Sequence, residues 1–146
     1  MVEDLIRSME VSGHVSYIAA ISAVRRKMVE YQRMLGNEKG VVMDGRDIGT
    51  VVFPDAAIKI FLTASLEVRA GRRYRELIEK EMAADYDEVQ KNLDKRDQID
   101  SSRADSPLKQ AEDAILLDNS EMTLEQQMIW FKELYGRVTS GADEKD

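Results

Sequence analysis

The sequence contains no cysteine, one histidine and two prolines among its 146 residues. Without cysteine the chain forms neither disulfides nor thiolate metal sites, and a single histidine cannot supply a histidine-based metal site. No apolar run approaches the roughly 18 to 20 residues that a membrane-spanning helix needs. The acidic start, Met1 to Asp4, also lacks the apolar core of a signal peptide. These absences predict a cytoplasmic protein with no membrane contact and no metal site of its own.

Positive charge is scarce as well, because 21 lysines and arginines stand against 28 aspartates and glutamates, for a net charge of −7. This balance argues against a partner such as nucleic acid or a membrane surface, which requires a broadly basic face. The basic groups are instead gathered in a local set that could hold a small polyanion: Arg69, Arg72, Arg73, Arg75, Arg96 and Arg103. With 43% apolar residues, the chain is long enough for one modest core and is predicted to form one domain.

Apolar periodicity and capping residues predict the helices. Apolar residues recur every three or four positions over residues 15 to 35, which predicts one amphipathic helix ended by Gly36. Ser65 and Asp85 precede two charged helical stretches, and Thr123 has the capping-box spacing of a last helix. The first of these helices is expected over residues 65 to 83, and the last over residues 123 to 138. The second begins at Asp85, reaches the segment of residues 96 to 103 near Lys95, and is ended by Ser106 and Pro107.

Short apolar runs predict strands at residues 41 to 43, 56 to 62 and 114 to 117. Strands that alternate with helices indicate an α/β protein with a parallel sheet. Residues 1 to 14 are expected to be an irregular or helical lead-in. The polar tail, residues 139 to 146, is expected to be frayed or disordered.

Two segments carry most of the chemistry. Residues 44 to 50, Asp-Gly-Arg-Asp-Ile-Gly-Thr, follow an expected buried strand, where α/β proteins place ligand sites. Residues 96 to 103 begin and end with arginine and include two aspartates. Guanidinium groups bind phosphate oxygens in pairs, and carboxylates accept hydrogen bonds from ribose hydroxyls. Together the segments predict a site for a phosphorylated nucleoside.

Residues 44 to 56, Asp-Gly-Arg-Asp-Ile-Gly-Thr-Val-Val-Phe-Pro-Asp-Ala, resemble the signature stretch of the bacterial cytidylate (CMP) kinase family. The segments that follow resemble the same family in order: residues 58 to 62, 65 to 73, 96 to 103 and 114 to 120. The resemblance covers about the C-terminal two thirds of the family. It implies an incomplete P-loop nucleoside monophosphate kinase-like fold, with a helical lid, whose phosphate-binding loop lies upstream of Met1.

This resemblance divides the single partial domain, residues 1 to 146, into five regions. They are the end of the acceptor-binding region with its helix (1–36), the core strands and acceptor loop (40–64), the lid and arginine-aspartate segment (65–106), the last strand and helix (107–138), and the tail (139–146).

The resemblance also assigns roles to the acceptor side chains. Arg46 and Arg96 would hold the acceptor phosphate, Asp100 the ribose hydroxyls, and Arg103 would lie near base and phosphate. Asp44 would orient Arg46 or contact magnesium. Without the resemblance, ordinary salt bridges explain the same charges.

Reading cytosine requires donors to O2 and N3 and an acceptor for the exocyclic amine. The family positions that contact the base correspond to Ser16, Arg25 and Asp47. Taken alone, Ser16 could be a helix-start residue and Arg25 part of a solvated helix face. The lid arginines Arg69, Arg72 and Arg73 would close over the donor triphosphate; alternatively, they stabilise a solvated helix through pairs such as Arg72 with Glu76.

Three hypotheses follow. The first is a fragment of the kinase that transfers the γ-phosphoryl group of ATP to CMP or dCMP with Mg²⁺, giving CDP or dCDP. It would be inactive alone because the sequence has no Gly-x-x-x-x-Gly-Lys-Ser/Thr loop. The second is a nucleotide-binding module without catalysis. The third is an interaction domain that self-associates through an exposed sheet edge.

Overall fold

The computed structural model describes residues 6–38 and 40–140. Five α-helices, two strands and one π-helical turn follow one another along this part of the chain. Their order is α2 (Met9–Ala19), α3 (Ser22–Leu35), η1 (Ile48–Val52), β1 (Ile60–Thr63), α4 (Leu66–Glu79), α5 (Tyr86–Ser102), β2 (Ile115–Asp118) and α6 (Leu124–Ser140).

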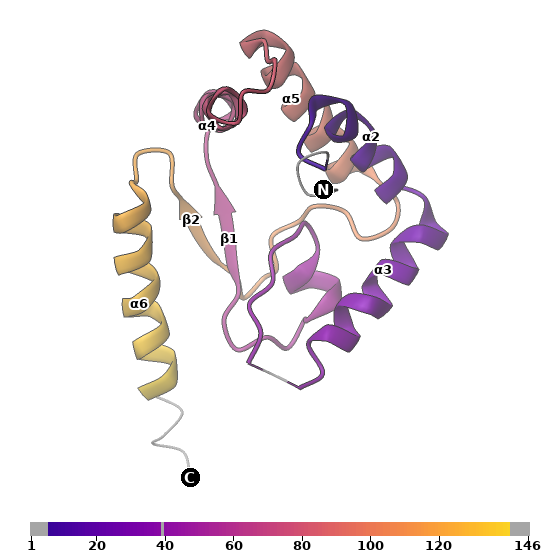
Figure 1. The fold of residues 1–146 in the computed structure, drawn as a ribbon. Helices are drawn as coiled ribbons and strands as arrows, with labels where there is room; N and C mark the ends of the chain where they lie inside the picture. The colour runs from indigo at the N-terminus through magenta and orange to yellow at the C-terminus, as the bar shows by residue number, and fades with distance from the viewer. Residues whose placement is uncertain (1–5, 39, 141–146) are drawn as a thin grey trace.

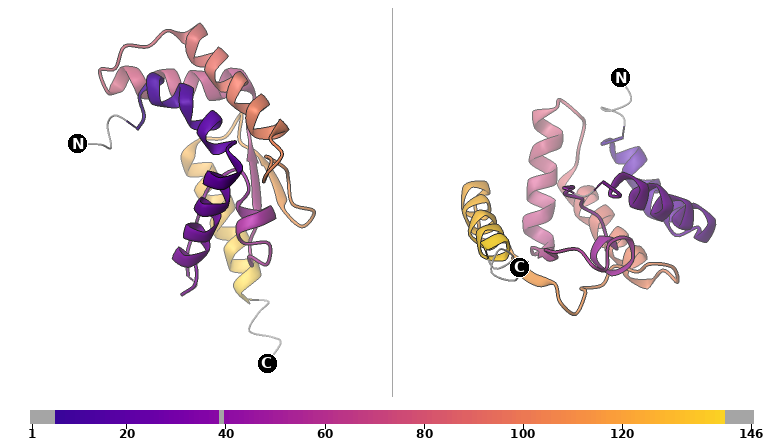
Figure 2. Two further views of the ribbon diagram at one scale, coloured as in Figure 1. Left: turned by 90° about the vertical axis from the view of Figure 1, so that its right-hand side faces the viewer. Right: turned by 90° about the horizontal axis from the view of Figure 1, so that it is seen from below.

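The two strands stand between two groups of helices (Figure 1). α6 lies on one side of the strands, while α2 and α3 lie on the other side, and the view from below shows the same separation (Figure 2). α4 and α5 pack against each other at one end of the strands, and α2 packs on α5. The predicted α/β class with a parallel sheet is therefore confirmed at this level.

The sheet is small and pairs β1 with β2 in parallel, with Ile60 opposite Ile115 and Thr63 opposite Asp118. Its backbone ladder is extended by the amide of Asn119, which donates to the Thr63 carbonyl at 2.9 Å. This bond places the turn after β2 at the carboxyl end of β1, beside the start of α4.

The local start signals in the sequence are confirmed. The Ser65 hydroxyl accepts from the Val68 amide at 3.2 Å, and the Asp85 carboxylate accepts from the Glu88 amide at 3.0 Å. Thr123 begins α6 with a reciprocal capping box. Each cap satisfies a backbone donor that has no partner within its own helix.

The single helix predicted over residues 15 to 35 is wrong, because the structure has two helices that meet at Ile21. Ile21 has an extended backbone with φ −71° and ψ 113°. α2 packs on α5, whereas α3 packs on η1, so a straight helix could not reach both neighbours. The lead-in is helical from Met9, where Ser8 caps α2; residues 1–5 lie outside the described residues.

Two further boundaries differ from the predictions. Residues 41 to 43 form no strand, since neither strand of the sheet pairs with them, and Val42 is 93% exposed. The strand expected over residues 56 to 62 begins only at Ile60. The helix that begins after Asp85 runs to Ser102, so most of the arginine-aspartate segment is helical, and it ends before Ser106 and Pro107, as expected. Thr139 and Ser140 still belong to α6, and the rest of the expected tail, residues 141–146, lies outside the described residues.

Large apolar side chains remain exposed on the sheet and on α6, including Leu62, Leu116 and Leu124. The buried apolar core is correspondingly small, with Leu77 and Val89 joining α4 to α5 and Leu134 lying on α6. Among the described residues, no helix combines the length and apolar character needed to span a membrane.

Candidate functional site

Three segments that are distant in the sequence bring arginines and aspartates into one cluster. Arg25 on α3 lies 3.3 Å from Asp47, at the start of η1. Arg103, at the end of α5, lies 3.9 Å from Asp47 and 3.4 Å from Asp100. Arg46 donates from Nε to Asp100 at 3.1 Å. A continuous set of charge contacts therefore joins five of the predicted site residues.

The cluster is buried at its centre and open at Arg46. The side chains of Asp47 and Arg103 are 1% and 2% exposed, whereas the Arg46 side chain is 41% exposed. Burial lowers the pKa of Arg103, and the nearby positive charge of Arg25 lowers it further. Burial likewise lowers the pKa of Arg96, with the charge of Arg46 as the next cause. Both shifts indicate positive charge confined in a poorly solvated space.

The charge balance of this cluster is unequal. Arg96 belongs to the cluster because the charges of Arg46 and Asp100 both act on its pKa. With Arg96, the cluster contains four guanidinium groups and two carboxylates, an excess of two positive charges. A phosphate monoester carries about −1.5 to −2 charge at neutral pH. The excess positive charge of the cluster therefore matches the negative charge of a phosphate monoester.

The backbone around Asp47 is held by a tight turn. The Asp47 carbonyl accepts from the amide of Val52 at 3.1 Å, which closes the π-helical turn. Arg33 on α3 donates to the Val51 carbonyl at 2.6 Å and so ties α3 to the turn. A side chain at Gly45 would place its Cβ 2.9 Å from the side chain of Ile48, which would then have to shift. The signature stretch thus presents Asp47 from a fixed backbone.

Arg103 is fixed by the loop that follows it. Its Nε donates to the Ser106 carbonyl at 2.8 Å, and the Leu108 amide donates to the Asp100 carbonyl at 2.7 Å. Ser106 has φ +52°, a left-handed conformation that is uncommon outside glycine. The loop backbone therefore accepts the hydrogen bond of Arg103 Nε, while the two Nη atoms face the carboxylates of Asp47 and Asp100.

Arg96 is held by two residues that sequence reasoning missed. Its Nη1 donates to the Ser12 hydroxyl on α2 at 2.9 Å, and that hydroxyl donates to the Asn92 side chain at 2.9 Å. Ser12 lies one turn before Ser16 on the same face of α2. This spacing was the only signal in the sequence that could have drawn attention to Ser12.

The three residues predicted to read the base share an unusual property. Ser16 Oγ, Arg25 Nε and Asp47 Oδ2 are buried and have no hydrogen-bond partner among the described residues. Buried polar atoms normally have a hydrogen-bond partner, so a buried polar atom without a protein partner is available to bind a ligand or a water molecule. The set includes an N–H donor, a carboxylate acceptor and a hydroxyl.

Asp44 is not part of these contacts. It is exposed, and no hydrogen bond or ion pair of its side chain occurs within residues 6–38 and 40–140. The same residues contain no group of three histidine, cysteine, aspartate or glutamate side chains that could hold a metal ion. The role expected of Asp44, orienting Arg46 or contacting magnesium, stays a prediction.

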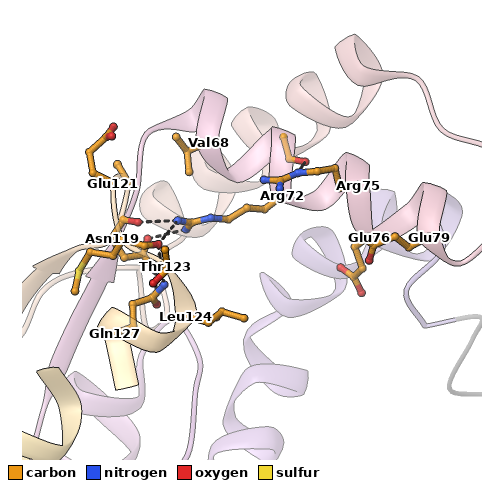
Figure 3. Close-up of a pocket in the computed structure, with 13 residues that line it drawn as sticks. Val68, Arg72, Arg75, Glu76, Glu79, Asn119, Glu121, Thr123, Leu124 and Gln127 are labelled. Carbon is orange, nitrogen blue, oxygen red and sulfur yellow. Dashed lines mark hydrogen bonds between the residues drawn. The ribbon is translucent and has the colours of Figure 1, made fainter. Parts of the chain in front are cut away.

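The lid arginines point to protein partners rather than to the cluster. Arg69 bonds Asp97 at 2.6 Å, and Arg73 bonds Glu76 at 2.6 Å. Arg72 donates to the Asn119 side chain at 2.8 Å and to the Asn119 carbonyl at 2.6 Å (Figure 3). The pair expected between Arg72 and Glu76 is replaced by this bond to Asn119, a residue that sequence reasoning missed.

A groove of about 750 Å³ lies between α4 and the turn that leads into α6 (Figure 3). Arg72 and Asn119 form part of its wall, together with Val68, Thr123 and Gln127. This groove is separate from the arginine-aspartate cluster, since none of the cluster residues lines it.

Residues 1–130 match the cytidylate kinase family. The sequence is 56% identical to a cytidylate kinase of Phocaeicola vulgatus over 140 residues, which is 96% of this chain and 61% of that protein. It is 58% identical to a cytidylate kinase of Parabacteroides distasonis over 137 residues, and 55% identical to one of Porphyromonas gingivalis over 139 residues. In both, the match covers 94% of this chain and 60% of the relative. The chain thus spans about 60% of the length of these curated relatives.

Proposed function

Since this chain belongs to the cytidylate kinase family, we propose that its arginine-aspartate cluster binds the acceptor nucleotide, CMP or dCMP, of a nucleoside monophosphate kinase. The observation that carries the proposal is the excess of two positive charges in a cluster whose centre is buried. A phosphate group would neutralise that excess and accept charge-assisted hydrogen bonds from the guanidinium groups.

Within the site, Arg46 and Arg96 contact the phosphate. Asp100 accepts hydrogen bonds from the ribose hydroxyls, and Arg103 lies between ribose and phosphate. Asp100 is already bonded by Arg46 and Arg103, so its carboxylate is held in place before a ligand arrives. Preorganised charges of this kind lower the cost of binding and hold the acceptor oxygen in place for transfer.

The base is read by the buried atoms that have no partner among the described residues. Arg25 Nε donates to O2 or N3 of cytosine, Asp47 Oδ2 accepts from the exocyclic amine, and Ser16 Oγ supplies a further bond. A base that lacks the amine would leave the Asp47 carboxylate oxygen unpaired and buried, which disfavours its binding.

The phosphoryl donor and the metal belong to the whole enzyme. ATP would supply the transferred phosphoryl group, and Mg²⁺ would neutralise charge on its phosphates. The role that we propose for this chain is acceptor binding and orientation. For Arg69, Arg72 and Arg73 to contact the donor, each would have to leave its present protein partner. We propose that this partial domain, with an incomplete P-loop-type sheet, has no kinase activity on its own.

A titration calorimetry experiment tests this proposal. The chain should bind CMP weakly, in the high micromolar to millimolar range, and Arg46→Ala should weaken binding by roughly ten- to a hundredfold, because one charged hydrogen-bonding group is lost. Arg26→Ala is the matched control, since Arg26 is an exposed arginine whose ion pair with Asp105 is long, at 3.7 Å. Equal affinity of Arg46→Ala and the parent chain would refute the assignment.

A second proposal, self-association, is favoured by the exposed apolar side chains of the sheet, with Leu62 57% and Leu116 56% exposed. Exposed contiguous apolar surface promotes association. Sedimentation velocity would test it: a mass that increases with concentration supports association, and a monomer at all concentrations excludes it.

A further inference from the structure

Two residues outside the expected site form a hydrogen-bonded chain that ends at Arg96. Ser12 on α2 accepts a hydrogen bond from Arg96 Nη1 at 2.9 Å, and its hydroxyl donates to Asn92 Oδ1 at 2.9 Å. Asn92 and Arg96 both belong to α5 and are four residues apart, so they lie on one face of that helix. These two hydrogen bonds therefore join α2 to the face of α5 that carries Arg96.

The direction of each bond is determined by chemistry. A guanidinium group has donors and no acceptor, so the Ser12 oxygen must accept from Arg96. The single hydroxyl proton is then free for the Asn92 carbonyl oxygen, which is an acceptor. Ser12 thus uses its proton and one lone pair at once. An alanine or a valine at this position could do neither.

Burial makes this arrangement consequential. Ser12 is 6% exposed, and Arg96 is desolvated enough that burial is the main cause of its lowered pKa. Arg96 Nε is buried and has no hydrogen-bond partner among the described residues. The bond to Ser12 restrains one end of the guanidinium plane and leaves Nε available. A planar group held at one end presents its other donors in a fixed direction.

We propose that Ser12, oriented by Asn92, is a positioning residue for Arg96 that preorganises its guanidinium for the acceptor phosphate. This inference rests on the proposed function for the identity of the anion. Its physical content is independent of the ligand: without Ser12, the Arg96 side chain samples several rotamers. Binding then has to restore one of them at an entropic cost.

A simple packing role for Ser12 predicts a different pattern. Gly13 lies against Asn92, since a Cβ at Gly13 would be 4.0 Å from Asn92 Nδ2, so α2 and α5 are close at this point. If Ser12 only filled space between the helices, Ser12→Ala would lower stability and would weaken CMP binding equally with or without Arg96.

The experiment combines side-chain NMR with a double-mutant cycle on the 146-residue chain. In Ser12→Ala, the Nε–H order parameter of Arg96 should fall while that of Arg103, held by its own loop, stays unchanged. CMP binding should weaken by roughly three- to tenfold, less than the loss of a whole charged hydrogen bond. In an Arg96→Ala background, Ser12→Ala should cause no further loss. Ser12→Thr, which keeps the hydroxyl, should restore the Arg96 signal.

Two results would overturn the proposal: an unchanged Arg96 order parameter in Ser12→Ala, or an equal loss of CMP affinity in both backgrounds. Failure of the proposed function is distinguishable, because a parent chain that does not bind CMP refutes the acceptor site. The Arg96 order parameter then decides the positioning role alone. The control is Ser101→Ala, which removes an exposed serine from α5, the helix that carries Arg96.

Discussion

The central residue-scale feature is a set of buried charges that are only partly neutralised within the protein. Asp47 is shared by Arg25 and Arg103, and Asp100 by Arg46 and Arg103. A buried ion pair contributes little net stability, since desolvation offsets most of the attraction, so stability alone does not account for such a cluster. An anionic ligand that completes the charge balance does account for it.

Base selectivity should depend on Arg25. Arg25→Met keeps the length of the side chain and removes the donor at Nε, so we expect CMP binding to weaken and the preference for CMP over UMP to narrow, by roughly tenfold. Titration of both nucleotides against the parent and the variant measures this. Arg26→Met, next to it on the exposed side of α3, should change neither affinity. If the ratio of the CMP and UMP affinities were the same in Arg25→Met and in the parent, Arg25 would have a purely structural role.

Glu76 should make stability depend on acid pH. Lys80, Arg7 and Arg73 surround this carboxylate, and the hydrogen bond from Lys80 is the largest cause that lowers its pKa from 4.5 to about 2. Because the folded-state pKa is depressed, the stabilisation is complete above about pH 4.5 and is lost as pH falls towards 2. Thermal unfolding of Glu76→Gln should therefore show a weaker loss of stability than the parent over this range. If the melting temperatures of Glu76→Gln and the parent fell equally as the pH is lowered, a lowered pKa of Glu76 would be contradicted.

At the scale of elements, the sequence predicted what is local and missed what depends on distant partners. The caps at Ser65, Asp85 and Thr123 follow from residue chemistry within one turn, and the structure confirms them. The break at Ile21 was missed because it is determined by which neighbours α2 and α3 pack against, and periodicity carries no such information.

Hydrogen bonds between residues of separate elements could also not be predicted from the sequence. Arg72 meets Asn119 across 47 positions, and Ser12 meets Arg96 across 84. The arginine and aspartate residues of the site could be named from the resemblance, but their mutual contacts could not. Only the fold shows that Asp47 and Asp100 share Arg103.

The capping box of α6 gives an element-scale prediction. Thr123 Oγ1 accepts from the Gln126 amide at 3.2 Å, and the Thr123 amide donates to Gln126 Oε1 at 2.8 Å. Thr123→Ala should cost about 1 kcal/mol and increase amide hydrogen exchange in the first turn of α6 by roughly fivefold. Thr139→Ala, at the other end of the helix, should leave that turn unchanged. Equal exchange in the parent and Thr123→Ala would show that the cap does not stabilise α6.

At the scale of the whole molecule, the arginine-aspartate cluster and the groove beside α4 are separate features of one small fold. The parallel pairing of β1 and β2 was predictable from the alternation of strands and helices. The absence of pairing at residues 41 to 43 was not, because an apolar run becomes a strand only where a neighbouring strand lies beside it.

Catalysis by the isolated chain is not expected. With ATP, Mg²⁺ and CMP at saturating concentrations, a coupled ADP-release assay should show no turnover, because the sequence has no Gly-x-x-x-x-Gly-Lys-Ser/Thr loop to hold the donor phosphates. One lost contact to transition-state charge already costs about a hundred- to a thousandfold in rate. Clear turnover by residues 1–146 would require a donor site built from other residues.

The most direct test of the acceptor-site assignment is a map of amide and arginine side-chain NMR shifts as CMP is added to the 146-residue chain. The account predicts that the largest changes occur at Arg25, at Arg46 and Asp47, and from Arg96 to Arg103, with little change at Arg72 and Asn119. Changes confined to the groove between α4 and the turn before α6, or no saturable change at the cluster, would contradict it.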